Sequence, residues 1–168
     1  MRAFLLYFVV GILLILLQGT FLRLLPLGPV VPDLVLVLCV YLGLYHPTMG
    51  AALGSFLLGY SIDVVSSRVL GLNAFAMSLV FLSVYFSSRS IWIQNPLVTA
   101  MVVLFAAVVK GAALVLLWAI FLNVEGFWMG AAQYIIMEAL WAAVLAPAVF
   151  ALLRRGQSYL EQFSVAAP

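Results

Sequence analysis

The chain alternates between long apolar runs and short segments rich in charged residues, proline and polar side chains. Six apolar runs can be separated in this way, and they cover residues 3–22, 34–45, 49–65, 69–86, 97–122 and 127–153. The runs are continuously apolar and lack the alternation of a membrane β-barrel strand, so helices are expected. A helix needs about 20 apolar residues to cross a bilayer. The pattern therefore predicts an all-α integral membrane protein, a bundle of about six transmembrane helices.

The second run, residues 34–45, is short for a membrane span. About 12 residues of helix rise only about 18 Å, against about 30 Å of hydrocarbon. The run can be extended by Val30 and Val31 across Pro32, or it can form a re-entrant hairpin with the third run, residues 49–65. The sequence leaves both alternatives open.

Composition supports the membrane assignment. The residues are 68% hydrophobic and only 7% charged, whereas a soluble domain has about 25% charged residues. The small net charge of +2 forms no basic patch, so nucleic acid is not an expected partner and membrane lipid is. The single Cys39 is expected to be a buried hydrophobe. We expect one transmembrane domain over residues 1–155 and a short cytoplasmic tail over residues 156–168.

Arginine positions predict the orientation, because Lys and Arg concentrate in short cytoplasmic loops. With the N-terminus inside, four arginines are cytoplasmic and two are external: Arg2, Arg89, Arg154 and Arg155 against Arg23 and Arg68. The first run is too long for a signal-peptide core and is expected to be retained. The chain is therefore predicted to be a multi-pass protein of a bacterial cytoplasmic (inner) membrane with both termini in the cytoplasm.

Two ionisable residues lie deep within apolar runs. Lys110 lies about 12 residues before the outer end of the fifth run, and Glu138 about 11 residues after the start of the sixth. The two runs are joined by a short turn, so Lys110 and Glu138 are expected at equal depth on antiparallel neighbours. We predict an intramembrane ion pair that fixes helix register. The alternatives are a proton or substrate pathway, or a Lys110 that snorkels without meeting Glu138.

Other candidate residues suggest local structural roles. Asp63 near the end of the third run can pair with Arg68, cap the following turn or contact a partner, and a local role is expected. Asp33 after Pro32 fits ordinary helix-start chemistry. His46 has no second metal ligand nearby. The chain lacks a phosphate-binding loop, metal-ligand spacing and a nucleophile with its base, so neither an enzyme, a cofactor nor a metal is expected.

Small residues recur along the third run at Gly50, Gly54 and Gly59. Small side chains let helix backbones approach closely in a membrane. This glycine ridge is a candidate helix-packing surface, either within the bundle or against a partner.

Three segments resemble the MreD family of rod shape-determining proteins. Residues 32–36, Pro-Asp-Leu-Val-Leu, resemble the family's start of its second span. Gly54 through Gly59-x-x-x-Asp63 resembles its glycine-rich span that closes on an acid, and residues 70–74, Leu-Gly-Leu-Asn-Ala, resemble the segment that opens the next span, with Val69 in place of the usual proline. Trp141, Pro147 and the Arg154-Arg155 end also fit, over essentially the whole chain.

The resemblance implies a non-enzymatic part of the cell-elongation machinery. Such proteins associate with the membrane protein MreC, and through it with MreB and the lateral-wall peptidoglycan synthases, and Asp63 would be the motif acid. The family is also similar in fold to the substrate-binding subunits of energy-coupling-factor transporters. A vitamin-uptake subunit is therefore the main alternative, with a thin polar set of Asn73, Gln133, Tyr134 and Glu138. A lipid-handling enzyme is a third possibility.

Overall fold

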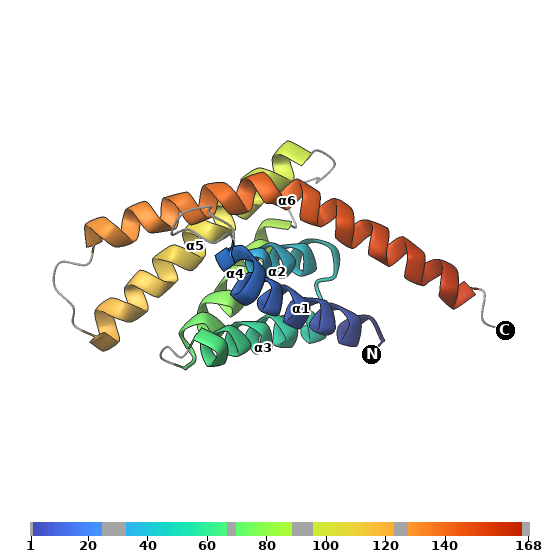
Figure 1. Ribbon diagram of the computed structural model, residues 1–168, viewed down its shortest axis with the longest axis horizontal. Helices are drawn as coiled ribbons and strands as arrows, with labels where there is room; N and C mark the ends of the chain where they lie inside the picture. Colours follow the sequence, from blue (N-terminus) through green and yellow to red (C-terminus); the bar gives the residue numbers. More distant parts are fainter. Residues whose placement is uncertain (1, 25–32, 67–69, 89–95, 123–127, 166–168) are drawn as a thin grey trace.

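The computed structural model describes residues 2–24, 33–66, 70–88, 96–122 and 128–165. Over these residues the chain is helical, with six helices separated by short connections (Figure 1). They are α1 (Arg2–Leu24), α2 (Leu34–Tyr45), α3 (Met49–Ser66), α4 (Leu72–Ser88), α5 (Pro96–Leu122) and α6 (Trp128–Val165). Each predicted apolar run corresponds to one helix, so the all-helical prediction is confirmed.

The short helix α2 lies at the centre of the bundle and contacts α1, α3, α4, α5 and α6. Its residues from Leu34 to Gly43 are all buried. The sequence of α2 is apolar on every side, and a helix of this kind is stable only when other helices surround it. Its 12 residues rise about 18 Å, so α2 alone is too short to cross about 30 Å of hydrocarbon.

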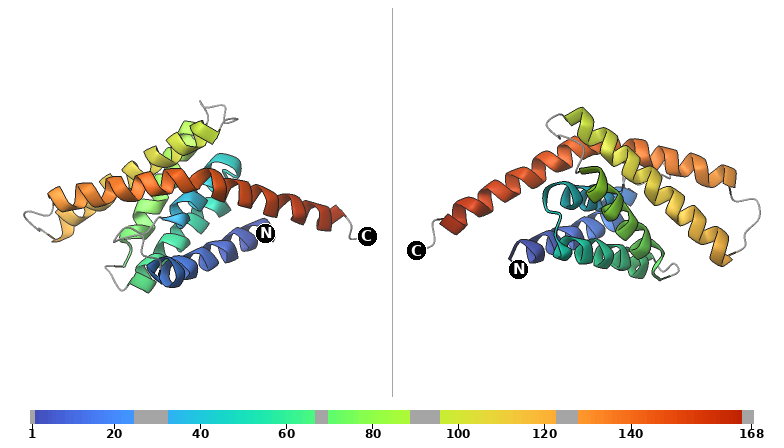
Figure 2. Two further views of the ribbon diagram at one scale, coloured as in Figure 1. Left: turned by 45° about the horizontal axis from the view of Figure 1, so that its top comes forward. Right: turned by 180° about the vertical axis from the view of Figure 1, so that it is seen from behind.

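The remaining helices form two hairpins and one flanking helix. α3 packs against α4, α5 packs against α6, and α4 joins the two pairs by contacting α5. Within the described residues, α1 contacts only α2 and α3. Figure 2 shows that the paired ends of α5 and α6 extend beyond the cluster formed by α1 to α4.

Large apolar side chains are exposed on the outer faces of the helices. Leu13 on α1, Leu53 on α3, Phe86 on α4, Met101 on α5 and Val144 on α6 are all at least half exposed. In water such a surface would drive aggregation, and in a bilayer it is the expected lipid-facing surface. Three helical stretches are long and apolar enough to cross a membrane: Met49–Ser66, Leu97–Ile120 and Ile135–Gly156. The chain is therefore a helical membrane protein.

Helix α6 extends beyond the last apolar run. The run ends at Arg154-Arg155, but the helix continues to Val165, because charge ends an apolar run without breaking a helix. The 38 residues of α6 span about 57 Å, and Figure 1 shows the helix bent. Pro147 lies inside it, and an internal proline removes a backbone hydrogen bond and kinks a helix.

Candidate functional site: a buried ion cluster

Three charged side chains from three helices meet inside the bundle. Lys110 of α5 reaches both Glu138 of α6 and Asp33 at the start of α2. Its Nζ lies 3.0 Å from Glu138 Oε1 and donates a second hydrogen bond to Asp33 Oδ2. The structure thus brings the side chains of Lys110 and Glu138 together. We call these three residues the ion cluster.

The members of the ion cluster differ in burial. The side chains of Asp33 and Lys110 are 8% and 11% exposed, whereas that of Glu138 is 21% exposed. A lone charge at the centre of a membrane costs about 2.5–3.5 kcal/mol on insertion scales. Lys110 pairs directly with Asp33, so neither of these two buried charges is left without an opposite charge. The cluster ties α2, α5 and α6 together at one level of the bundle.

Asp33 has a second role that the sequence analysis did not identify. As expected for a helix start, its Oδ1 accepts a hydrogen bond of 3.0 Å from the Leu36 amide and caps α2. Assigning Asp33 to that role alone is incomplete, because its other oxygen is bound by Lys110, 77 positions away. The sequence does contain a hint of this pairing. A carboxylate at the start of a fully apolar helix needs a cation nearby, and Lys110 lies within an apolar run.

Asp63 organises the turn between α3 and α4. Its side chain is fully buried and accepts hydrogen bonds from the amides of Gly71, Asn73 and Ala74 and from the Asn73 side chain, at 2.8–3.2 Å. Gly71 has a φ of 98° and carries no side chain that could cap α4, so Asp63 supplies the cap from the preceding helix. Of the contacts considered for Asp63, the structure places its side chain at the following turn. Arg68, the alternative partner, lies outside the described residues.

The glycine ridge packs largely inside the bundle. Gly54 and Gly59 are buried, and Gly50 is partly exposed at the start of α3. A Cβ at Gly59 would lie 2.6 Å from the Asn73 carbonyl oxygen and 2.7 Å from Ala74 Cα. Gly59 thus permits the contact between α3 and the first turn of α4. Of the two predicted uses of the ridge, the structure places Gly54 and Gly59 in internal packing.

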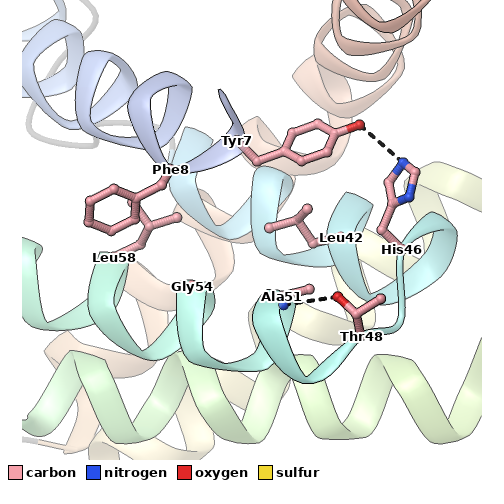
Figure 3. Close-up of a pocket in the computed structure, with 8 residues that line it drawn as sticks. All are labelled: Tyr7, Phe8, Leu42, His46, Thr48, Ala51, Gly54 and Leu58. Carbon is pink, nitrogen blue, oxygen red and sulfur yellow. Dashed lines mark hydrogen bonds between the residues drawn. The ribbon is translucent and has the colours of Figure 1, made fainter. Parts of the chain in front are cut away.

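A small cavity of about 110 Å³ lies among α1, α2 and α3. Figure 3 shows Tyr7, His46 and Thr48 at one end and Phe8 and Leu58 at the other, with Gly54 along the wall. Tyr7 Oη lies 3.0 Å from His46 Nε2, and the Thr48 hydroxyl accepts from the Ala51 amide. The cavity has room for a few water molecules and is too small for a vitamin.

The polar residues considered for a vitamin pocket are dispersed. Asn73 is engaged by Asp63, and Glu138 is engaged by Lys110. Gln133 is exposed, and the Tyr134 side chain lies outside the described part. Among the residues whose side chains are described, no group of three His, Cys, Asp or Glu could hold a metal ion.

Comparison with known proteins places these features in a family. The family model described as rod shape-determining protein MreD matches residues 2–156, which include the ion cluster, the Asp63 turn and all the candidate spans. Neither the curated proteins nor the solved structures contain a significant match to the chain. Because the family match covers nearly the whole sequence, the chain belongs to the MreD family of rod shape-determining proteins.

Proposed function

We propose that this protein is a non-enzymatic membrane component of the rod complex that binds the transmembrane segment of MreC. Through that contact it supports lateral peptidoglycan synthesis and rod cell shape, with MreB and the lateral-wall synthases as indirect partners. The observation that carries the proposal is the family match over residues 2–156.

The structure supports a holding role over a chemical one. The described residues are almost entirely helical, and their outer faces carry large exposed apolar side chains. Association between helices in lipid depends on close packing and a few polar contacts, because lipid itself is as apolar as the helices. The ion cluster ties α2, α5 and α6 together, and Asp63 ties α3 to α4, so a preformed face can be offered to another helix.

The proposed orientation has both termini in the cytoplasm of a bacterial inner membrane, with about six membrane-embedded helices. Two contacts at the C-terminal end of α2 support it. Tyr7, near the start of α1, bonds His46, and Arg154 of α6 bonds the Tyr45 hydroxyl and lies 4.8 Å from its ring centre. The beginning of α1 and the Arg154 end of α6 therefore lie at the same end of the bundle. A likeness to energy-coupling-factor substrate subunits remains part of this proposal.

The test is copurification of the tagged full-length protein from native membranes. We expect MreC among the recovered proteins in amounts comparable to the bait. An unrelated multi-pass protein, tagged and expressed at the same level, is the control and should recover none. Recovery of an ATPase module together with a bound vitamin, and no MreC, would overturn the proposal in favour of transport.

A further inference from the structure

The charges of the ion cluster do not balance. Two carboxylates, Asp33 and Glu138, share the single ammonium group of Lys110. Asp33 is also satisfied by the Leu36 amide. In the described part of the chain, Lys110 Nζ is the only group that bonds Glu138, and it occupies Oε1. With all three groups ionised, the cluster carries one surplus negative charge at a depth where water is scarce.

The surplus lies at the most accessible member of the cluster. Glu138 is the most exposed of the three, and it begins a stripe of residues that recur at helical spacing along one side of α6. The α6 stripe consists of Glu138, Trp141, Leu145, Ala148 and Leu152. Trp141 is 38% exposed and Leu152 is 70% exposed, and Ala148 is a small exposed residue that allows a second helix to approach closely.

We propose that the α6 stripe is the docking face for the partner's transmembrane helix, and that Glu138 receives a lysine or arginine side chain from that helix. The inference rests on the proposed function and specifies where the partner binds. Charge complementarity selects the occupant, because one basic group brings the cluster to neutrality. Trp141, one turn away, offers an aromatic face beside the incoming cation.

Lipid alone does not meet the requirement of this site. Hydrocarbon offers no hydrogen-bond donor to the second oxygen of Glu138, and polar groups at this depth must find partners within protein. The Asp33–Lys110 pair is neutral without Glu138, so Glu138 is not needed to compensate Lys110. A partner that supplies a positive charge to Glu138 explains why this residue lies at the exposed edge of the ion cluster.

Site-specific photocrosslinking locates the docking face. A photoreactive amino acid at Trp141 or Ala148 of the full-length protein should crosslink MreC in native membranes. The same amino acid at Ile136 or Leu140, which are exposed on another side of α6, is the matched control and should not. Crosslinks only from Ile136 and Leu140 would overturn the α6 stripe while leaving the proposed function intact. Absence of MreC from every crosslink and every copurification would overturn both.

Substitution of Glu138 tests the charge. Glu138→Gln leaves the Asp33–Lys110 pair in place, so the protein should fold normally while the amount of captured MreC falls about tenfold. Ile136→Gln introduces the same amide on another side of α6 and should leave capture unchanged. Changing the basic residue of the MreC helix to leucine should cause the same loss, with no further loss when combined with Glu138→Gln. Additive losses, or an MreC helix without Lys or Arg, would overturn the proposal.

Discussion

At the scale of single residues, Asp63 is a fully buried acid that is stable because the turn around it supplies donors. Three backbone amides and one side-chain amide point at its two oxygens. Such a carboxylate stabilises the fold because it accepts hydrogen bonds from several buried amides. Without it, those amides would be left without partners. The motif acid of the family resemblance is therefore a cap for the next helix.

We expect Asp63→Ala to lower the unfolding free energy by about 2 kcal/mol, since it leaves the first amides of α4 without an acceptor. Ser78→Ala is the control, because the Ser78 hydroxyl bonds the Ala74 carbonyl of its own helix, and it should change stability by less than about 0.5 kcal/mol. Unfolding in bicelles, followed by circular dichroism, measures both. Equal stability of the two variants would show that the Asp63 contacts are dispensable.

The ion cluster gives a graded series of stabilities. Lys110→Leu leaves two unpaired carboxylates and should cost about 3–5 kcal/mol. Adding Glu138→Leu removes one of them, and adding Asp33→Asn removes the other while retaining an N-cap side chain. Stability should recover in two steps, with the triple variant the most stable of the three. A double variant as stable as the triple one would show that Asp33 without Lys110 does not destabilise the protein.

At the scale of helices, the contact between α3 and α4 depends on the absence of a side chain at Gly59. Its neighbours are backbone atoms of Asn73 and Ala74, which cannot rotate away as a side chain can. The α3–α4 hairpin is thus fixed both by the Asp63 cap and by a close approach of its two backbones.

Gly59→Ala should therefore destabilise the protein by about 1–3 kcal/mol through overpacking. Gly19→Ala on α1 is the matched control, because a Cβ there meets nothing within 4 Å, and alanine is favoured over glycine in a helix by about 1 kcal/mol. Thermal unfolding of both variants in the same detergent gives the comparison. A Gly59→Ala protein as stable as wild type would indicate that the hairpin is more loosely packed than this geometry implies.

At the scale of the whole molecule, the arrangement leads to a prediction about the membrane. Because Tyr7 and Arg154 both contact the C-terminal end of α2, the two termini are expected on one side. Reporter fusions at residue 1 and after residue 168 should both give cytoplasmic signals. A periplasmic signal from the C-terminal fusion would contradict an even number of crossings and would also remove the basis for the proposed orientation.

The sequence by itself determined the helical class and the six helical elements. These follow from local properties: apolar run length, turn residues and a rise of about 1.5 Å per residue. The sequence also identified Asp63 and the glycines of the third run as candidate residues. An acid or a glycine stands out in an apolar run whichever way its side of the helix faces.

The tertiary structure alone decided which helix lies at the centre, how Asp33 joins the ion cluster and which way the glycine ridge faces. These depend on contacts between residues far apart in the chain, such as Asp33 and Lys110. In a membrane helix, lipid-facing and protein-facing sides are both apolar, so hydrophobicity does not distinguish them. The side that each helix turns inward is fixed only when the helices pack. The partial exposure of the Glu138 side chain is a result of that packing.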